Sequence, residues 1–398
     1  MKIALLSYEY PPDTGYGGIG SYTFHQARGL AELGHEVTVF CGSARPARML
    51  VRHEDGVRVV RLRPSLPEGW ERDFERDQMW WTRGRMRNAV TMAAGLEELS
   101  AHHSFDVVEA PECGAEAALI AARGDWPLVI RFHSPAEMIM PLYDVRQRDQ
   151  LLSRFVERLG IFGATRHTAC SEYLALEAQR RFQLPRVPTV IHNGLDLAWF
   201  DTLSQSAAPQ RVAVPRGNTI VFFGARLERR KGADLLADIM APVLDEYPVS
   251  FVVAGVDNHQ GIRASLARRL GRPRAGSFHY LGKVELDAVR LWLAEAAICL
   301  IPSRWENCPY SCLEAMATGT AVVASRVGGL PELVEDGATG LLVEMDDVPS
   351  FQSAVRRLVG DPSYAERLGQ AARRRVEERF SARRMAEDSL REYERCLE

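Results

Sequence analysis

Lysine is almost absent from this chain. Among 398 residues it occurs only at positions 2, 231 and 283, although Lys and Arg together number 49. The formal net charge is −3 at pH 7, and no block of like charge forms a basic or acidic tail. Because the chain has neither a basic field nor a basic tail, nucleic acid is not expected as a partner.

Cysteine pairs and long apolar runs are also missing. Seven cysteines are present, an odd number without a Cys-x-x-Cys pair, so the sequence predicts neither a disulfide framework nor a zinc site. No stretch approaches the roughly 18 apolar residues of a membrane span, and the N-terminal "MKIALLSYEYPP" lacks the length and cleavage site of a signal peptide. We therefore expect a cytoplasmic protein, with at most a peripheral contact to the inner face of the membrane.

Short β-branched runs alternate with amphipathic stretches along the whole chain. The first half holds "KIALLSY", "EVTVF", "VRVVRL", "DVVEA" and "LVIRFH", and the second holds "TIVFFGA", "VSFVVAGV", "FHYLG", "ICLIPS" and "AVVASR". This alternation predicts an α/β fold of two tandem doubly wound, Rossmann-like domains that face each other across a cleft. We expect the domains at residues 1–200 and 219–375, joined by a linker at 201–218 and followed by a closing helix at 376–398.

A glycine-rich loop follows the first predicted strand. Gly15, Gly17 and Gly20 in "GYGGIG" match the G-x-G-x-x-G pattern of dinucleotide-binding proteins. A proline-containing loop separates these glycines from the strand, and no acid follows the second strand to hold a ribose, so the match to an NAD-linked oxidoreductase is weak. The loop precedes a predicted helix, and its amides could meet a phosphate or a sugar oxygen. A flexible turn is the alternative.

Two cations follow the strand "TIVFFGA". Arg226 and Lys231 stand in "FFGARLERRKGADLL", just before a predicted helix. A planar guanidinium and a point-charge ammonium together suit a diphosphate, and the scarcity of lysine makes Lys231 notable. Glu228, Arg229 and Arg230 are open to a simpler interpretation as a solvated charged face.

Two acids flank a short loop in "RWENCPYSCLEAMATGTAVVAS". Pro309 disfavours helix in the residues before it, so Glu306 is predicted in a loop at a strand end. Ser311 and Glu314 form the S-x-x-E pattern of a capping box, which is the purely structural alternative for Glu314. A glycosidase acid pair is also compatible with the spacing.

Two further strand ends carry polar residues. His133 ends "LVIRFH", although a lone histidine is more often structural than functional. Asn193 and Gly194, which follow "TVIH", are typical of a turn.

Taken together, these segments resemble the retaining glycosyltransferases of family 4, which have the GT-B fold. The similarity runs over most of the chain, from "GGIGSYTFHQARGLAELGHEVTVF" through His133, "ACSEYLA", "VIHNGLDLAWF", "FFGARLERRKG" and "YLGKVELD" to "ENCPYSCLEAMATGTAVVASRVGGLPELVEDGATGLLV". Its most specific parts are E-x7-E, from Glu306 to Glu314, and Arg-x4-Lys, from Arg226 to Lys231.

The resemblance implies a role for each matching residue. Glu306 would hold the donor sugar, Glu314 the ribose, and Arg226 with Lys231 the diphosphate, whereas His133 would contact the sugar near the reacting carbon. Gly17 and Gly18 would approach the donor phosphate, and the backbone at Lys283 and Val284 would frame the base. Backbone amides of the remaining donor-binding residues would meet sugar and phosphate: Asn307, Cys308, Tyr310 and Ser311.

The activity implied is retaining transfer of a sugar from a UDP-, GDP- or ADP-sugar to a hydroxyl of a glycan, a lipid-linked or a small-molecule acceptor. The family's favoured mechanism is a same-face displacement without a metal or another cofactor. Pro309 stands where many members have glycine, and His192 replaces a more typical proline, so donor identity stays open. A nucleotide-sugar epimerase and a non-catalytic nucleotide-sugar binder are the remaining alternatives.

The acceptor side is marked only by a segment rich in tryptophan. "RPSLPEGWERDFERDQMWWTRGRMRNAV" carries Trp70, Trp80 and Trp81 among basic residues. Such aromatics can dock a sugar ring, a lipid carrier or a membrane surface. We favour inward packing of these side chains and expect the segment to shape the acceptor site.

Overall fold

The computed structural model describes residues 1–15, 17–45, 47–202, 219–257, 261–272, 274, 276–284 and 286–398. Two compact units contain these residues. Unit 1 comprises Met1–Asp196 and Ala382–Glu398, and unit 2 comprises Leu197–Ser381. The linker expected at 201–218 lies outside the described residues except for its first two positions.

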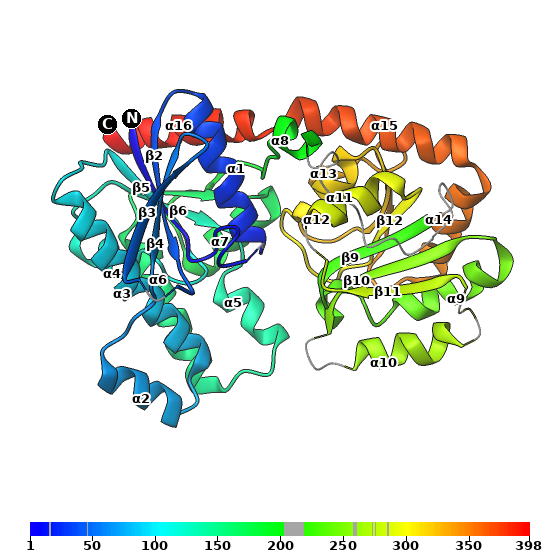
Figure 1. The fold of residues 1–398 in the computed structure, drawn as a ribbon, viewed down its shortest axis with the longest axis horizontal. Helices are drawn as coiled ribbons and strands as arrows, with labels where there is room; N and C mark the ends of the chain where they lie inside the picture. The colour runs from blue at the N-terminus through cyan, green and yellow to red at the C-terminus, as the bar shows by residue number, and fades with distance from the viewer. Residues whose placement is uncertain are drawn as a thin grey trace. The chain divides into compact units, whose positions relative to one another are not determined.

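Unit 1 is built on an eight-stranded sheet (Figure 1) in the order β3-β4-β2-β1-β5-β6-β7-β8. Every pairing is parallel except that of β3 with β4, because a tight turn at Asp55 and Gly56 joins these two strands. The strands are β1 (Lys2–Leu6), β2 (Glu36–Gly42), β3 (Met49–Glu54), β4 (Val57–Leu62), β5 (Val107–Pro111), β6 (Leu128–Phe132), β7 (Arg166–Ala169) and β8 (Thr189–Val190).

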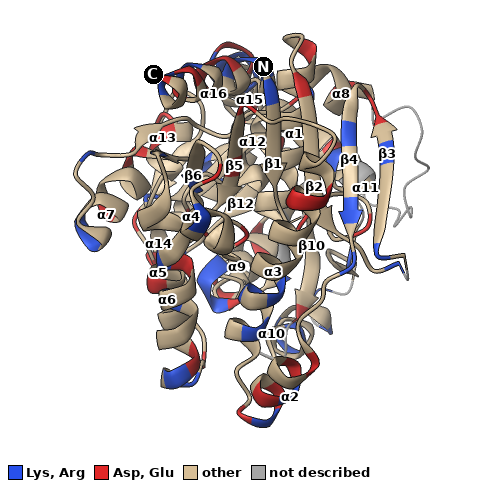
Figure 2. Cartoon of the chain, turned by 90° about the vertical axis from the view of Figure 1, so that its left-hand side faces the viewer, with Lys and Arg blue, Asp and Glu red and all other residues tan. Residues whose placement is uncertain are grey.

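Helices cover the unit 1 sheet because its strands are apolar on both faces, as in "KIALL", where four of five residues are buried. The helices of unit 1 are α1 (Gly18–Glu32), α2 (Glu68–Arg76), α3 (Trp80–Ser100), α4 (Ala118–Arg123), α5 (Ala136–Ile139), α6 (Gln147–Gly163), α7 (Glu172–Phe182) and α16 (Ala382–Leu397), and all of them except α2, which has no buried residue, have residues in the interior. Helix α16 packs on α1. At their contact, a methyl group on Gly29 would lie 2.6 Å from the Ala382 carbonyl oxygen, so the two helices approach closely there. Charged residues are dense on α2 and α16 (Figure 2).

Unit 2 is built on a six-stranded parallel sheet in the order β11-β10-β9-β12-β13-β14. The strands are β9 (Thr219–Leu227), β10 (Ser250–Asp257), β11 (Phe278–Gly282), β12 (Ile298–Ile301), β13 (Ala321–Ser325) and β14 (Leu341–Val343). The larger helices are α9 (Leu236–Glu246), α11 (Leu286–Glu295), α12 (Tyr310–Ala317), α14 (Val348–Gly360) and α15 (Pro362–Arg379), and the shorter ones are α8 (Leu197–Thr202), α10 (Ile262–Leu266) and α13 (Leu330–Leu333).

The predicted α/β class with two Rossmann-like parallel sheets is confirmed. In such sheets the loops that follow neighbouring parallel strands meet at one edge. β9 and β12 are neighbours, so the segments after Leu227 and after Ile301 lie together. These are the segments that carry Lys231 and Glu306.

Candidate functional site

The centre of the candidate site is an ion pair in unit 2 between the segments that follow β9 and β12. Lys231 ends a single 3-10 turn (Arg229–Lys231), and its Nζ donates to Glu306 Oε1 at 2.6 Å. The Ser303 hydroxyl donates to the same oxygen at 2.9 Å. Glu306 lies in the loop before α12, as Pro309 predicts, and is only 4% exposed.

Burial and charge act in opposite directions on this pair. Burial raises the pKa of Glu306, but Lys231 and Arg230 outweigh it and hold the pKa below its usual value. Burial also lowers the pKa of Lys231, which Glu306 opposes. The charge of each group therefore depends on the charge of the other.

Arg226 is held beside this pair by a buried acid. Its Nε lies 3.0 Å from Glu228 Oε1, and half of its side chain is exposed. Glu228 is 2% exposed, and the Arg230 Nε lies 3.5 Å from its second carboxylate oxygen. The interpretation of this run as a solvated face is therefore wrong for Glu228 and Arg230, because both are buried against each other.

Two glycines bring the loops this close. Gly232 has a φ of 67°, and a methyl group there would lie 1.8 Å from the Pro302 carbonyl oxygen. Gly328 has a φ of 54°, and a methyl group there would lie 1.8 Å from the Glu306 carbonyl oxygen. The Glu306 backbone is thus packed directly against a second loop, in which Gly329 N donates to its carbonyl at 3.1 Å.

Glu314 lies in α12, behind the loop. The capping box with Ser311 is wrong: the helix begins at Tyr310 with Pro309 as its N-cap, no side chain caps it, and Ser311 lies inside the first turn. Burial raises the pKa of Glu314 to about 7. Its carboxyl group is thus available for a role other than capping. Asn307, Cys308 and Tyr310, from the same loop, are all buried.

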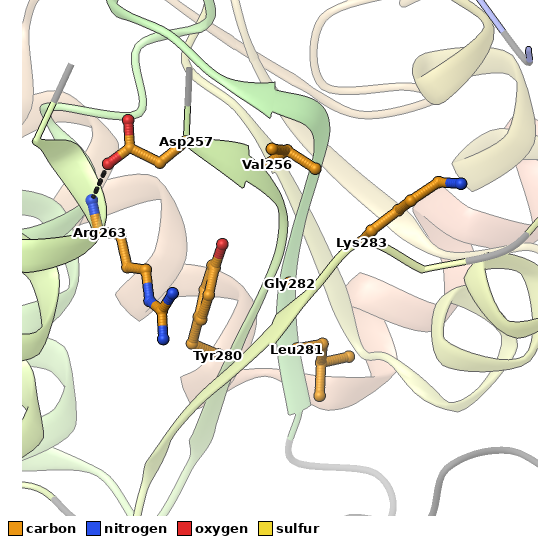
Figure 3. A pocket seen from close by; sticks show the side chains of 7 residues that line it. All are labelled: Val256, Asp257, Arg263, Tyr280, Leu281, Gly282 and Lys283. Carbon is orange, nitrogen blue, oxygen red and sulfur yellow. Dashed lines mark hydrogen bonds between the residues drawn. The ribbon is translucent and has the colours of Figure 1, made fainter. Parts of the chain in front are cut away.

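The predicted base-framing residue Lys283 lines a pocket of about 430 Å³ at the carboxyl ends of β10 and β11 (Figure 3). Tyr280 and Arg263 form one wall, with the guanidinium carbon 5.0 Å from the ring centre. The remaining lining residues are Val256, Asp257, Leu281 and Gly282. Val284 follows directly in the chain and is half-buried. The pocket offers one aromatic ring and two cations.

Unit 1 holds Gly17, Gly18 and His133. Gly17 is the N-cap of α1, and a methyl group there would overlap the Glu9 carboxylate, whereas Gly18 borders open space. His133 follows β6, is 6% exposed, and its backbone N donates to Glu112 Oε2 at 2.8 Å. Burial, aided by Arg131, holds the pKa of His133 well below its usual value, so its imidazole is neutral.

The His133 ring rests on a buried polar network. The ring centres of His133 and Tyr22 lie 4.8 Å apart. The Arg131 guanidinium carbon lies 4.2 Å from the centre of the same Tyr22 ring. Tyr22 and Tyr393 of α16 both donate to Glu109, at 2.5 and 2.7 Å. The last helix is thus joined through Glu109 of β5 to Tyr22, the residue whose ring contacts His133.

Two family models match the chain. "Glycosyl transferase 4-like domain" matches residues 17–194, and "Glycosyl transferases group 1" matches residues 217–361. Alpha-maltose-1-phosphate synthase of Mycobacterium tuberculosis strain H37Rv is 30% identical over 98% of each chain. D-inositol 3-phosphate glycosyltransferase of Streptomyces avermitilis is 28% identical over 94% of this chain and 84% of its own. The chain belongs to the family 4 glycosyltransferases.

Solved structures agree with the GT-B fold of this glycosyltransferase. Sucrose-phosphate synthase of Thermosynechococcus elongatus superposes with a TM-score of 0.75 at 23% identity, covering 99% of this chain and 98% of its own. Starch synthase IV of Arabidopsis thaliana, in a complex with ADP and acarbose, gives 0.75 at 16% identity and covers 100% and 99%. The predicted resemblance to this family is confirmed.

Sequence reasoning missed several buried groups of the glycosyltransferase. Burial raises the pKa of Glu112 and of Glu116 to about 8, and both lie just after β5. Their positions in "EAPECGAE", at a strand end, are the signal that could have revealed them. Ser303 and Gly328 had no such signal, because their contacts with Glu306 depend on how three loops meet.

The tryptophan segment differs from the expectation. Trp70 and Trp80 are 48% and 55% exposed, so inward packing is wrong for both. The Arg83 guanidinium lies over the face of the Trp80 ring, where a cation is attracted to the π electrons. Trp81 is half-buried, and its ring centre lies 5.7 Å from that of Tyr143.

The described part of the chain offers neither a metal site nor a membrane span. Among the described residues, no three His, Cys, Asp or Glu side chains are grouped so that they could hold a metal ion. Within the same residues, no helix combines the length and apolar character needed to cross a bilayer.

Proposed function

We propose that this glycosyltransferase moves a sugar from a nucleoside-diphosphate sugar to a hydroxyl acceptor with retention of the anomeric configuration. The observation that carries the proposal is the buried Lys231–Glu306 pair, with Arg226 beside it, at the carboxyl edge of the unit 2 sheet. A cation and an acid at one strand edge match a donor that carries negative charge at one end and sugar hydroxyls at the other.

In the donor complex, the diphosphate lies against Arg226 and Lys231. Lys231 then shares its charge between the diphosphate and Glu306, whose carboxylate accepts hydrogen bonds from the donor sugar. As the anomeric C–O bond breaks, its electron pair goes to the phosphate oxygen, where the fixed cations stabilise it. The acceptor oxygen attacks the same face of the sugar, and its proton passes to the departing phosphate.

His133 acts as a neutral partner in this scheme. Its low pKa means that it can donate or accept a hydrogen bond at a sugar hydroxyl without adding a charge near the developing positive carbon. Gly17 offers its backbone without a side chain, because Glu9 occupies the space where one would lie. Both features support binding of a sugar and phosphate rather than proton transfer by unit 1.

The nucleoside occupies the rest of the unit 2 edge. Glu314 holds the ribose, and the base enters the pocket beside Lys283 and Val284, where Tyr280 provides an aromatic wall. The complex of the structurally similar starch synthase IV with ADP supports a nucleoside diphosphate as the leaving group.

The ribose role of Glu314 predicts a pH-dependent affinity. An ionised carboxylate accepts hydrogen bonds from both ribose hydroxyls, and its pKa of about 7 means that it ionises between pH 6 and 8. We expect the affinity for the matching nucleoside diphosphate to rise about tenfold across this range. Titration calorimetry at several pH values measures the change.

The control for this prediction is Glu314→Gln. The diphosphate titrates in the same range, and it does so equally with both proteins, so only the difference between them reports Glu314. Stability should change in the opposite sense to affinity: a raised pKa stabilises the fold below pH 4.5, and this contribution is lost as the pH rises through 7. Equal pH profiles for the two proteins would refute the ribose role.

The test of the proposed function is a panel of UDP-, GDP- and ADP-sugars with and without sugar acceptors. We expect one donor to release nucleoside diphosphate rapidly only when an acceptor is present, and NMR of the product to show the donor's anomeric configuration. Conversion of the donor without an acceptor would identify an epimerase. Binding without turnover of any donor would identify a non-catalytic binder.

A further inference from the structure

Glu112 holds the backbone that carries His133. It follows β5 directly, and β5 and β6 are parallel neighbours in which Pro111 pairs with Arg131, so the two strand ends lie together. Its two carboxylate oxygens accept from the backbone N of His133 at 2.8 Å and from that of Ser134 at 2.5 Å. One buried side chain thus fixes two successive amides at the end of β6.

A second buried acid extends this support. Pro135 has no amide hydrogen, and the next amide, that of Ala136, donates to Glu157 Oε2 of α6 at 2.8 Å. The other oxygen of Glu157 accepts from Arg85 Nε of α3 at 2.7 Å. Every backbone amide hydrogen from residue 133 to residue 136 is therefore bound by a buried carboxylate.

An acid at position 112 is a costly way to bind these amides. Amides beyond a strand end need an acceptor, and neutral Asn, Ser and Thr side chains commonly provide one. Glu112 is 1% exposed, and among the described residues no Lys or Arg forms an ion pair with it. Burial, together with the nearby Glu157, raises its pKa to about 8, although the amide bonds oppose the rise. Burying an acid without a cation destabilises a fold, which indicates a role other than stability.

We propose that Glu112 is a positioning residue for sugar transfer, which acts by fixing His133 at the donor sugar. This inference rests on the proposed function, in which the imidazole binds a sugar hydroxyl. The imidazole keeps one position only when both its ring and its backbone are held. Its ring packs on Tyr22, with the centres 4.8 Å apart, and Glu112 supplies the second restraint. Misplacement of a contact group by about 1 Å can lower a rate about 100-fold.

The first test measures binding, so it does not require turnover. Glu112→Gln keeps the size of the side chain, but its amide group places a donor against one of the two backbone donors, so one bond is lost. We expect the affinity for the intact nucleotide sugar that the donor panel identifies to fall about three- to tenfold. The affinity for the matching nucleoside diphosphate, which lacks the sugar that His133 binds, should not change. Titration calorimetry without an acceptor measures both.

The second test asks whether Glu112 acts through His133. Glu112→Gln alone should lower kcat about ten- to hundredfold. In a His133→Ala background the same substitution should change neither kcat nor the donor affinity, because the group that it positions is gone. A purely structural acid would instead have the same effect in both backgrounds.

Glu116→Gln is the matched control. Glu116 follows in the same segment, is 3% exposed and also has a pKa that burial raises to about 8. Its Oε1 accepts from Tyr8 N and not from the segment that carries His133. This variant should lose a similar amount of thermal stability to Glu112→Gln, and its effect on kcat should be the same with and without His133.

The outcomes separate the role of Glu112 from the function on which it rests. A wild type that transfers sugar, together with a Glu112→Gln variant that keeps its kcat and its donor affinity, would overturn the role of Glu112 and leave the proposed function standing. Equal effects of Glu112→Gln with and without His133 would do the same. A wild type that neither transfers sugar from any donor in the panel nor binds one would overturn the proposed function, and the role of Glu112 with it.

Discussion

Replacing Lys231 with methionine is expected to lower kcat by about 10²- to 10³-fold, the usual loss when one preorganised electrostatic group is removed. Methionine keeps the length of the side chain and removes only its charge. The Lys231 Nζ lies 2.6 Å from Glu306 Oε1, so the substitution also removes the main group that lowers the pKa of this acid. The acid limb of the pH–rate profile should therefore move to higher pH.

A loss of activity could also follow from a loss of stability. Removing one partner of a buried ion pair typically costs 3–5 kcal/mol of unfolding free energy, because the other charge remains buried and unpaired. The double variant Lys231→Met with Glu306→Gln removes both charges. We expect it to regain most of the stability of the wild type and to regain none of its activity.

Lys2→Met is the matched control for lysine removal. Lys2 begins β1 in unit 1, is exposed, and donates to Ser104, so kcat should not change. Thermal unfolding and release of nucleoside diphosphate measure stability and activity on the same samples. If the double variant recovers activity together with stability, the role of Lys231 is structural and the proposed chemistry fails.

The sequence anticipates those parts of the site that depend on neighbouring residues. Pro309 correctly placed Glu306 in a loop, because the restriction that proline imposes acts on the residues next to it. The parallel sheets followed from apolar runs, although β3 was missed: "MLVRHE" is a half-exposed edge strand without a continuous apolar run.

Two other features of the structure did not follow from the sequence, the first for a local reason and the second because it depends on distant contacts. The capping box failed because Pro309 itself takes the N-cap position, which shifts Ser311 into the helix. The bonds from Tyr22 and Tyr393 to Glu109 join residues up to 284 positions apart. No local pattern predicts such a contact, since it arises only when the last helix packs on the sheet.

Replacing Gly328 with alanine is expected to lower the unfolding free energy of unit 2 by about 3–5 kcal/mol, among the largest effects of a single substitution. Two costs add. Gly328 has a φ of 54°, where alanine is strained by about 1 kcal/mol. The new methyl group would also lie 1.8 Å from the Glu306 carbonyl oxygen, so one of the two loops must move.

Gly337→Ala separates these two costs. Gly337 has a φ of 75° in the same unit, and a methyl group there would meet nothing within 4 Å. This variant should lose only about 1 kcal/mol from backbone strain and keep its activity. Because the Gly328 loop supports the backbone of Glu306, Gly328→Ala should lower kcat even under conditions where it remains folded. Equal losses of stability and activity in the two variants would show that the contact with Glu306 has no part in holding the donor site.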